Sequence, residues 1–320
     1  MNEADVTMRS WLADPANTLV LDGGLGSTLS NLGADLNHPL WSARMIKDDP
    51  DRIERVHDAF FAAGAAVATT ATYQASYAGF ASFGIEHDEA GELIREAVRI
   101  AQRSASNCFE HTGRTVYVAG SCGPFGATLN NGSEYTGDYA PSHADLVGFH
   151  LERARMLASE GVDVLAFETI PNGNEVAAIC AVLDELGNVP AWISVQCRDG
   201  EHIASGEHVG EVLSAAALHP QVIAIGCNCT HPRYVSQVLS SLRSITDKPL
   251  IVYPNRGGEW DSSTKTWIGS DETFTAAHAT AWRTLGAQLI GGCCGVGPDL
   301  IIEVAAVVSA RGQAAQADPA

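Results

Sequence analysis

The chain has 320 residues, of which 46% are hydrophobic and 18% charged, a composition typical of a folded globular protein. Its formal net charge of −19 argues against a nucleic-acid partner, because no basic cluster is present to neutralise phosphates. No apolar run approaches the ~20 residues of a membrane-spanning helix and no signal-peptide pattern is visible, so we expect a cytoplasmic protein with reduced thiols and no membrane partner.

The first part of the chain begins an alternation of short apolar runs and amphipathic helices. Residues 18–21 form a predicted buried strand, which ends at the turn Asp22-Gly23-Gly24. The irregular residues 27–47 are interpreted as a long extended loop. A helix follows from about Pro50, and Gly64 is expected to end it.

Seven further units repeat this order of strand and helix. The predicted strands comprise residues 66–70, 116–120, 164–167, 191–195, 222–225, 250–253 and 288–290. The predicted helices comprise residues 89–107, 142–161, 175–186, 209–218, 233–242, 273–285 and 300–309. Ser142 and Asp145 have the spacing of a capping box, and Gly161 and Gly286, like Gly64, are well placed to end helices.

Eight alternating strands and helices predict a parallel sheet with right-handed connections. We expect a single-domain (β/α)8 TIM barrel spanning residues 1–310, with a flexible carboxyl-terminal tail at residues 311–320. Long polar loops follow the first and third strands, on the face where barrel enzymes have their active sites. An open doubly wound sheet is the alternative, although no dinucleotide-type glycine fingerprint supports it.

Two clusters of cysteines follow predicted strands. Cys227 and Cys229 come after residues 222–225, and Cys293 and Cys294 follow the last strand. Because the carboxyl ends of barrel strands share one face, Cys229, Cys293 and Cys294 are expected to converge there. Strand alternation puts Cys227 on the same side as Cys229, and we expect it deeper inside the barrel.

Thiolates from separate strands are typical zinc ligands, and three of them leave one coordination position open. Cys293 and Cys294 can share one ion only if the backbone turns between them, which the flanking glycines allow. A vicinal disulfide is the competing interpretation, and it is not expected in a reducing compartment. An open zinc position favours activation of a thiol substrate, because zinc deprotonates a coordinated thiol. No lysine follows a predicted strand, which argues against a Schiff-base aldolase.

Seven segments together resemble the homocysteine S-methyltransferase family. They are Asp22-Gly23-Gly24, Thr72-Tyr73-Gln74-Ala75-Ser76, Gly132-Ser133-Glu134-Tyr135-Thr136-Gly137, Glu168-Thr169-Ile170-Pro171, Gly226-Cys227-Asn228-Cys229, Tyr253-Pro254-Asn255 and Gly291-Gly292-Cys293-Cys294-Gly295. The resemblance covers about residues 19–308, and it is nearest to the stand-alone enzymes that use S-methylmethionine or S-adenosylmethionine. Arg256 departs from the family pattern, in which a small residue follows the asparagine.

The resemblance implies a zinc-dependent barrel that makes methionine from homocysteine. Cys229, Cys293 and Cys294 match the zinc ligands of the family. Asn255 matches a position that, in a related folate-dependent barrel, fills the fourth zinc position when substrate is absent. The cofactor expected from this resemblance is therefore Zn²⁺.

Other residues match positions that bind the substrates. Asp22 with Gly23 matches the segment that contacts homocysteine, and Glu168 matches the carboxylate that holds its ammonium group. Thr72, in the ring of polar residues expected at the barrel mouth, is a further candidate for substrate binding, as is Asn255.

The implied reaction is an in-line displacement, in which the zinc-held homocysteine thiolate attacks the methyl group of a sulfonium donor. Rate then comes from activation of the thiolate and from alignment. Tyr73, Tyr135, Tyr139 and Trp41 are candidates for cation–π contact with the sulfonium.

Two alternatives remain open at the level of the sequence. The first is a homocysteine or selenocysteine methyltransferase that uses betaine or a folate as its methyl donor. The second, from a different class, is a zinc-thiolate sensor without catalytic activity. The oligomeric state does not follow from the sequence.

Overall fold

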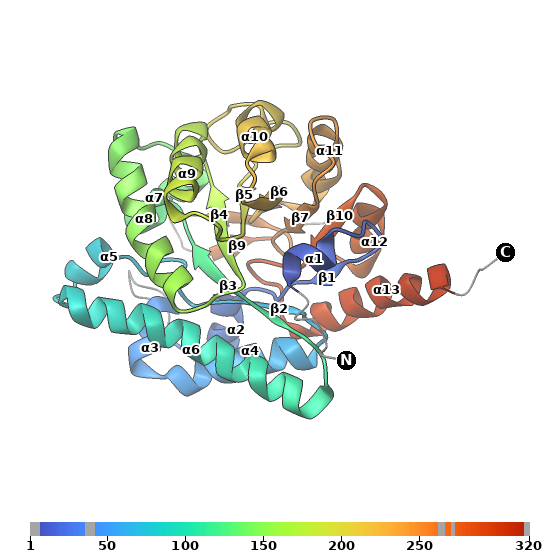
Figure 1. Ribbon diagram of the computed structural model, residues 1–320, viewed down its shortest axis with the longest axis horizontal. Helices are drawn as coiled ribbons and strands as arrows, with labels where there is room; N and C mark the ends of the chain where they lie inside the picture. The colour runs from blue at the N-terminus through green and yellow to red at the C-terminus, as the bar shows by residue number, and fades with distance from the viewer. Residues whose placement is uncertain (1–6, 36–41, 262–265, 270–272, 317–320) are drawn as a thin grey trace.

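The computed structural model describes residues 7–35, 42–261, 266–269 and 273–316, and Figure 1 shows a ring of strands surrounded by helices. The barrel strands are β1 (Leu19–Val20), β2 (Val67–Thr69), β3 (Tyr117–Cys122), β4 (Val164–Ile170), β5 (Ala191–Val195), β6 (Val222–Asn228), β7 (Leu250–Tyr253) and β10 (Ala287–Ile290). All neighbouring barrel strands are parallel, in the order β1-β10-β7-β6-β5-β4-β3-β2.

The two ends of this sheet also meet, so the ring is nearly closed. Leu21 forms a parallel bridge with Val67. The Ala66 amide donates to the Val20 carbonyl at 2.7 Å, and the Asp22 amide donates to the Val67 carbonyl at 3.1 Å. The predicted (β/α)8 barrel is confirmed, and the open doubly wound alternative is wrong.

The eight predicted helices are present and cover the outside of the barrel. They are α4 (Pro50–Ala62), α6 (His87–Thr112), α8 (His143–Ser159), α9 (Gly173–Leu186), α10 (Val209–Leu218), α11 (Pro232–Arg243), α12 (Ala276–Thr284) and α13 (Pro298–Gln316). Gly64, Gly161 and Gly286 have φ angles of 102°, 76° and 95°, as expected of residues that end helices. The capping box of Ser142 and Asp145 is also present.

The structure corrects the prediction in several connecting segments. Residues 27–47, predicted as an extended loop, contain most of α2 (Leu25–Asn31) and most of α3 (Ser42–Asp48), because side chains such as Leu29 and Ile46 are buried against neighbouring helices. Short elements absent from the prediction are α1 (Met8–Leu12), α5 (Tyr77–Ala81), α7 (Phe125–Thr128), the 3₁₀ helix η1 (Ser133–Tyr135) and the antiparallel pair β8 (Glu259–Asp261) and β9 (Thr266–Ile268). Helix α13 also continues beyond its predicted end at residue 309.

Strand alternation divides the core into two layers. One cluster fills the inside of the barrel and contains Trp192 and Tyr253, with Met8 and Leu12 of α1 packed against it. The other lies between the sheet and the helices. Cys227 belongs to this outer layer, so its predicted position inside the barrel is wrong.

A buried histidine in the outer layer provides a test of this packing. His57 on α4 is fully buried, and neither ring nitrogen has a hydrogen-bond partner among the described residues. Burial lowers the pKa of His57 to about 4. The unfolded chain takes up a proton near pH 6.5 whereas the folded protein does not, so this group destabilises the fold as pH falls from 6.5 towards 4.

We therefore expect His57→Leu to reduce the acid sensitivity of the fold. With 1.36 kcal/mol per pKa unit, the histidine costs about 3 kcal/mol at pH 4 and little at pH 8. Urea unfolding of wild type and variant at pH 5 and pH 8 measures this difference. His143→Leu, at an exposed position of α8, is the control. An equal effect of His57→Leu at both pH values would contradict the prediction.

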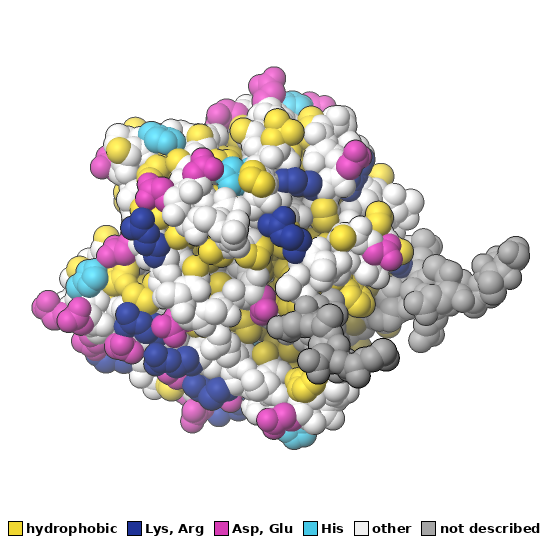
Figure 2. Space-filling model, in the orientation of Figure 1, with side chains coloured by type: hydrophobic (Ala, Val, Ile, Leu, Met, Phe, Trp, Pro, Cys, Tyr) yellow, Lys and Arg dark blue, Asp and Glu magenta, His cyan; other side chains and the backbone are white. Residues whose placement is uncertain are grey.

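Charged side chains of both signs are mixed over α6 on the face drawn in Figure 2. Arg95 pairs with Glu92 at 2.5 Å, and Arg103 pairs with Glu54 at 3.0 Å. These arginines therefore have carboxylate partners and do not form a basic strip. Within the described residues, no helix combines the length and apolar character needed to cross a membrane.

Candidate metal and substrate site

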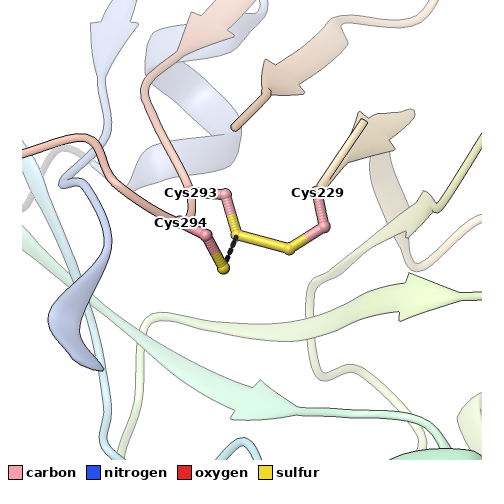
Figure 3. Close-up of side chains that lie close together, drawn as sticks. All are labelled: Cys229, Cys293 and Cys294. Carbon is pink, nitrogen blue, oxygen red and sulfur yellow. Dashed lines mark hydrogen bonds between the residues drawn. A yellow bond between two sulfur atoms is a disulfide. The ribbon is translucent and has the colours of Figure 1, made fainter. Parts of the chain in front are cut away.

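Three cysteine side chains converge at the carboxyl-end face of the barrel, as Figure 3 shows. Cys229 follows β6, whereas Cys293 and Cys294 follow β10, and β7 lies between these two strands. The three sulfur atoms all lie within 4.8 Å of one another. The structure thus brings together the three cysteines that the sequence proposed as a cluster.

The sulfur atoms of Cys229 and Cys293 are joined in a disulfide, which links the ends of β6 and β10. Cys294 keeps a free thiol, with its sulfur 4.0 Å from that of Cys293. The competing vicinal disulfide between Cys293 and Cys294 is therefore absent, and the expectation that all three thiols are reduced is also incorrect for this state of the protein.

Close packing explains why glycines flank the second cysteine pair. A Cβ atom at Gly291 would lie 2.5 Å from the Cβ of Leu21, and one at Gly292 would collide with Val296. Gly295 has a φ angle of 78°, which a residue with a side chain rarely adopts. The chain therefore turns tightly after β10, and the side chains of both neighbouring cysteines reach the same cluster.

Cys229 reaches the cluster through an unusual backbone angle. Its φ is 47°, a left-handed conformation that is uncommon outside glycine. Its amide donates to the Tyr253 carbonyl at 3.2 Å, and its carbonyl accepts from Asn255 Nδ2 at 3.0 Å. This turn breaks the strand alternation, so Cys229 faces the mouth although Cys227 faces the outer layer.

The three sulfurs fit a metal ion once the disulfide is reduced. Zinc–sulfur bonds of about 2.3 Å in tetrahedral geometry place sulfurs roughly 3.8 Å apart. The 4.0 Å between Cys293 and Cys294 already matches that spacing. Burial raises the pKa of the Cys294 thiol to about 12, so this thiol stays protonated at neutral pH without a nearby cation. A soft divalent metal ion is the kind of cation that such a donor set binds.

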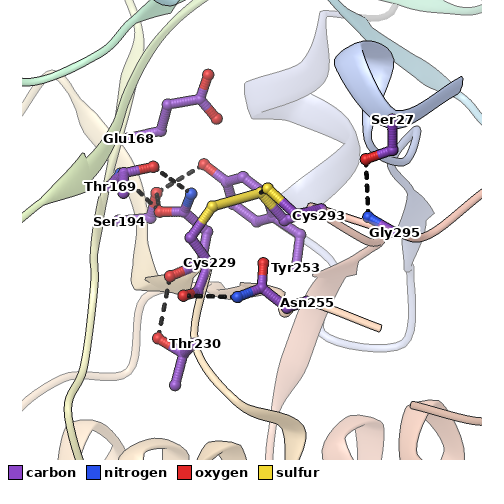
Figure 4. Close-up of a disulfide and its surroundings, with 12 residues drawn as sticks. Ser27, Glu168, Thr169, Ser194, Cys229, Thr230, Tyr253, Asn255, Cys293 and Gly295 are labelled. Carbon is purple, nitrogen blue, oxygen red and sulfur yellow. Dashed lines mark hydrogen bonds between the residues drawn. A yellow bond between two sulfur atoms is a disulfide. The ribbon is translucent and has the colours of Figure 1, made fainter. Parts of the chain in front are cut away.

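Glu168, at the end of β4, is a buried carboxylate beside the cysteines (Figure 4). Ser121 on β3 donates a hydrogen bond to its Oε1. Burial raises the pKa of Glu168, while hydrogen bonds from Ser121 and Tyr253 lower it. The charge of Arg153 also lowers the pKa of Glu168, but no direct ion pair to this carboxylate is present among the described residues. The ammonium group of a ligand would supply a direct cationic partner.

A polar network beneath the site holds Glu168 in place. The next residue, Thr169, has a φ angle of 60°. Asn228 Oδ1 accepts from the Thr169 amide at 2.7 Å and from Ser194 Oγ at 2.8 Å, while its Nδ2 donates to Thr169 Oγ1 at 2.7 Å. These bonds offset the cost of the unusual backbone angle, which is of order 1–3 kcal/mol.

Asp22, after β1, is a second buried carboxylate. Its two oxygens accept from the amide and the hydroxyl of Thr69, at 2.7 Å and 2.9 Å. Burial raises the pKa of Asp22 to about 7, against the lowering effect of Thr69, and the charge of Glu168 adds to the increase. The backbone of Gly23 is packed against Val296 and Phe60, which leaves no space for a side chain.

The raised pKa of Asp22 makes a testable prediction. Between pH 3.8 and 7 the folded protein binds more protons here than the unfolded chain, so this group destabilises the fold as pH rises. With 1.36 kcal/mol for each of about three pKa units, the cost reaches about 4 kcal/mol above pH 7. We expect Asp22→Asn to raise the free energy of unfolding at pH 8 and hardly at all at pH 4.

Urea unfolding without substrate measures this effect, because a bound ammonium group would itself favour ionised Asp22. Asparagine can keep both contacts to Thr69, so packing changes little. Asp247→Asn, at an exposed position, removes the same charge and is the control. An Asp22→Asn variant that is less stable than wild type at pH 8 would contradict the prediction.

The four aromatic residues predicted to contact the sulfonium do not all lie in the same part of the structure. Tyr73 and Tyr135 are half-buried. Their phenol groups are close enough that ionisation of Tyr135 would raise the pKa of Tyr73, and the Cys294 thiolate would likewise raise the pKa of Tyr135. Tyr139 instead donates a hydrogen bond to the buried carboxylate of Glu175. Trp41 lies outside the described residues. Of the three described candidates, Tyr135 and its neighbour Tyr73 are therefore the ones with recorded links to the cluster.

Thr72 and Asn255 are both buried at the barrel mouth, but they differ in whether a polar atom is left free to bind a ligand. The Thr72 hydroxyl donates to the Ser121 carbonyl at 2.7 Å and contacts Thr70, so it supports the loop. Asn255 Oδ1 has no partner among the described residues. Asn255 also lines a pocket of about 340 Å³ that opens beside Cys229 and Tyr135.

Several site residues were not proposed from the sequence as binding residues. Besides Cys229, Asn255 and Tyr135, the pocket is lined by Gln196, Arg198 and Arg233. Gln196 follows β5, and its position after a barrel strand is the signal that could have identified it. The positions of the two arginines could not be predicted from the sequence, because Arg198 lies in the loop after β5 and Arg233 lies at the start of α11.

Known proteins resemble this chain over nearly its whole length. Residues 19–308 match the family model described as homocysteine S-methyltransferase. The homocysteine S-methyltransferase YbgG of Bacillus subtilis (strain 168) is 40% identical over 302 residues, which cover 92% of this chain and 96% of that protein. The selenocysteine Se-methyltransferase of Brassica oleracea var. italica is 35% identical over 316 residues, covering 93% and 91%.

A solved structure agrees with the fold. The metallated form of the homocysteine methyltransferase MmuM from Escherichia coli superposes with a TM-score of 0.83 at 36% identity, covering 91% of this chain and 96% of that chain. An oxidised form of the same protein gives the same TM-score and identity. A metallated and an oxidised state are thus both known for a protein of this architecture.

Proposed function

Since this chain belongs to the homocysteine S-methyltransferase family, we propose that it transfers a methyl group from a sulfonium donor to homocysteine, using zinc held by Cys229, Cys293 and Cys294. The donor is S-methylmethionine or S-adenosylmethionine, and the product is methionine. The observation that carries the proposal is the convergence of three sulfurs from two strands beside a buried carboxylate that has no direct ion pair among the described residues.

Bound zinc would stabilise a substrate thiol as its thiolate at neutral pH, where a free thiol with a pKa near ~8.5 is only a few per cent ionised. Three cysteines leave one coordination position for that sulfur. Because Cys229 and Cys293 form a disulfide in this structure, they must be reduced before they can bind a metal ion. The reduced and metal-bound protein is therefore the active form.

The chain's own residues orient the amino-acid part of homocysteine. Glu168 accepts hydrogen bonds from the ammonium group, and Asp22 adds a second negative charge nearby. These contacts hold the sulfur of homocysteine towards the cysteine cluster, which gives the proximity that the displacement needs.

The transfer itself needs no acid from the protein. The homocysteine sulfur forms a bond to the methyl carbon, while the bond from that carbon to the donor sulfur breaks and its electron pair stays with the donor. A thiolate and a sulfonium thus become two neutral thioethers. Tyr73 and Tyr135 offer aromatic faces to the cationic donor, and the pocket beside Cys229 has room for an amino-acid-sized ligand.

The decisive experiment measures metal content and methionine formation in the same preparation. Protein purified under reducing conditions should contain about one zinc per chain and form methionine with a sulfonium donor. The four donors to compare are S-methylmethionine, S-adenosylmethionine, betaine and methyltetrahydrofolate, and selenocysteine serves as a second acceptor. Turnover by the metal-free protein would overturn the role of zinc.

The disulfide gives a specific reason to consider a second function, a zinc-thiolate sensor that responds to oxidation. Zinc release on oxidation without turnover of any donor would favour the sensor. Methionine formation from a sulfonium donor would exclude it as the main function. An enzyme that accepts only betaine or methyltetrahydrofolate would keep homocysteine methylation but overturn the proposed donor.

A further inference from the structure

Four buried oxygen acceptors around the barrel mouth have no hydrogen-bond partner among the described residues. They are Gln74 Oε1, Glu134 Oε2, Gln196 Oε1 and Asn255 Oδ1. Each of the three amides donates its nitrogen to a backbone carbonyl, at 3.4 Å, 3.1 Å and 3.0 Å respectively. Those bonds fix the amide orientation, so an acceptor and not a donor is left unpaired in every case.

Glu134 is the charged member of this set, and the chain holds it firmly. It lies in η1, and a Cβ atom at Gly126 would lie only 2.8 Å from its amide nitrogen. The same loop is anchored to the barrel through Glu175, which accepts from Tyr139, from the Phe125 amide at 2.7 Å and from His150 at 2.7 Å. The position of Glu134 is therefore built into the fold.

Residues next to Glu134 in the chain lie at the pocket beside the cysteine cluster. Gly132, Tyr135 and Thr136 line the pocket that contains Cys229, whereas Glu134 itself is not one of its lining residues. The charge of Glu134 also acts on Cys294, Tyr73 and Tyr135. Glu134 has no ion-pair partner within the described part of the chain, and a desolvated carboxylate without one is unfavourable.

We propose that Glu134 is a specificity-determining residue that recognises the positive charge on the sulfur of the methyl donor. This inference rests on the proposed function, in which the donor is a sulfonium. A cation between Glu134 and the faces of Tyr73 and Tyr135 compensates the buried carboxylate. After transfer the donor sulfur is neutral, so the attraction ends and the product is released more easily.

The test compares two ligands that differ in this charge. S-Methylmethionine carries a sulfonium and an ammonium group, whereas methionine carries the ammonium group and a neutral thioether. Their dissociation constants are measured by calorimetry on the reduced, zinc-loaded protein without homocysteine. Glu134→Gln should weaken S-methylmethionine binding by roughly ten- to a hundredfold and change methionine binding little. Glu134→Asp should have an intermediate effect.

Kinetics give a second readout of the same residue. The kcat/KM for S-methylmethionine should fall in Glu134→Gln by the factor seen in binding, with the KM for homocysteine unchanged. Asp138→Asn removes a charge from an exposed position of the same loop and should alter neither value. Equal weakening of S-methylmethionine and methionine would overturn the inference, because it would indicate an ammonium contact or a structural role.

The two proposals fail in different ways. A wild type that forms methionine from S-methylmethionine, with a Glu134→Gln variant that keeps its preference for the sulfonium ligand, overturns the inference and leaves the proposed function standing. A wild type that binds S-methylmethionine in preference to methionine but transfers no methyl group overturns the proposed function. In that case, loss of the preference in Glu134→Gln still supports the inference.

Discussion

Cys294→Ser is expected to remove the metal and the activity while leaving the disulfide between Cys229 and Cys293 able to form. Cys294 takes no part in that disulfide, so its replacement tests metal binding separately from oxidation. Loss of one of three ligands should weaken zinc binding by at least about a hundredfold, since even changes to residues behind the ligands cost about 10–100-fold. Methionine formation should fall at least as far.

Zinc content by mass spectrometry, together with turnover under reducing conditions, measures both effects. Cys180→Ser is the matched control, because Cys180 is a half-buried thiol on α9 outside the cluster. A Cys294→Ser protein that keeps full zinc and full turnover would contradict the three-cysteine site. Loss of both in the Cys180→Ser control would show instead that the fold does not tolerate a lost thiol.

The second large effect is expected from Glu168→Gln. Glutamine has nearly the same shape and can keep the contact to Ser121, but it lacks the charge that holds an ammonium group. A hydrogen bond to a charged group contributes about 1.5–3 kcal/mol, so the kcat/KM for homocysteine should fall roughly 10–100-fold. The KM for the methyl donor should change much less.

A substrate without an amino group separates the ammonium contact from general damage. 4-Mercaptobutanoate has the thiol and carboxylate of homocysteine but no ammonium group. Wild type should prefer homocysteine strongly, and Glu168→Gln should lose most of that preference. Glu110→Gln, at an exposed position of α6, should behave as wild type. If Glu168→Gln slowed both thiols equally, the carboxylate would not be the ammonium partner.

The barrel and the cysteine cluster could be predicted from the sequence because each follows from a regular pattern. Apolar runs alternating with amphipathic helices define parallel strands, and parallel strands bring their carboxyl ends to one face. That rule was sufficient to place Asp22, Glu168, Asn255 and Cys229 around one mouth. The turn at residues 291–295 was likewise indicated by its glycines, each of which the structure shows to be tightly packed or left-handed.

What could not be predicted depends on local departures from those patterns. Strand alternation put Cys227 and Cys229 on one side, but the left-handed backbone at Cys229 separates them. Residues 27–47 lack a helical pattern, and tertiary burial of side chains such as Leu29 stabilises α2 and α3. Glu134 was visible only as part of a motif, because its missing partner is a property of the folded loop.

The position of β10 in the chain has a consequence for how a metal ion would reach the proposed site. Cys293 and Cys294 follow the last barrel strand, and they meet Cys229 only when β10 lies between β1 and β7. A ribosome makes the chain from its amino terminus, so a nascent polypeptide that ends before β10 carries one of the three ligands. Under the proposed function, metal loading would therefore follow the synthesis and docking of β10, and the metal would not template folding of the earlier strands during synthesis.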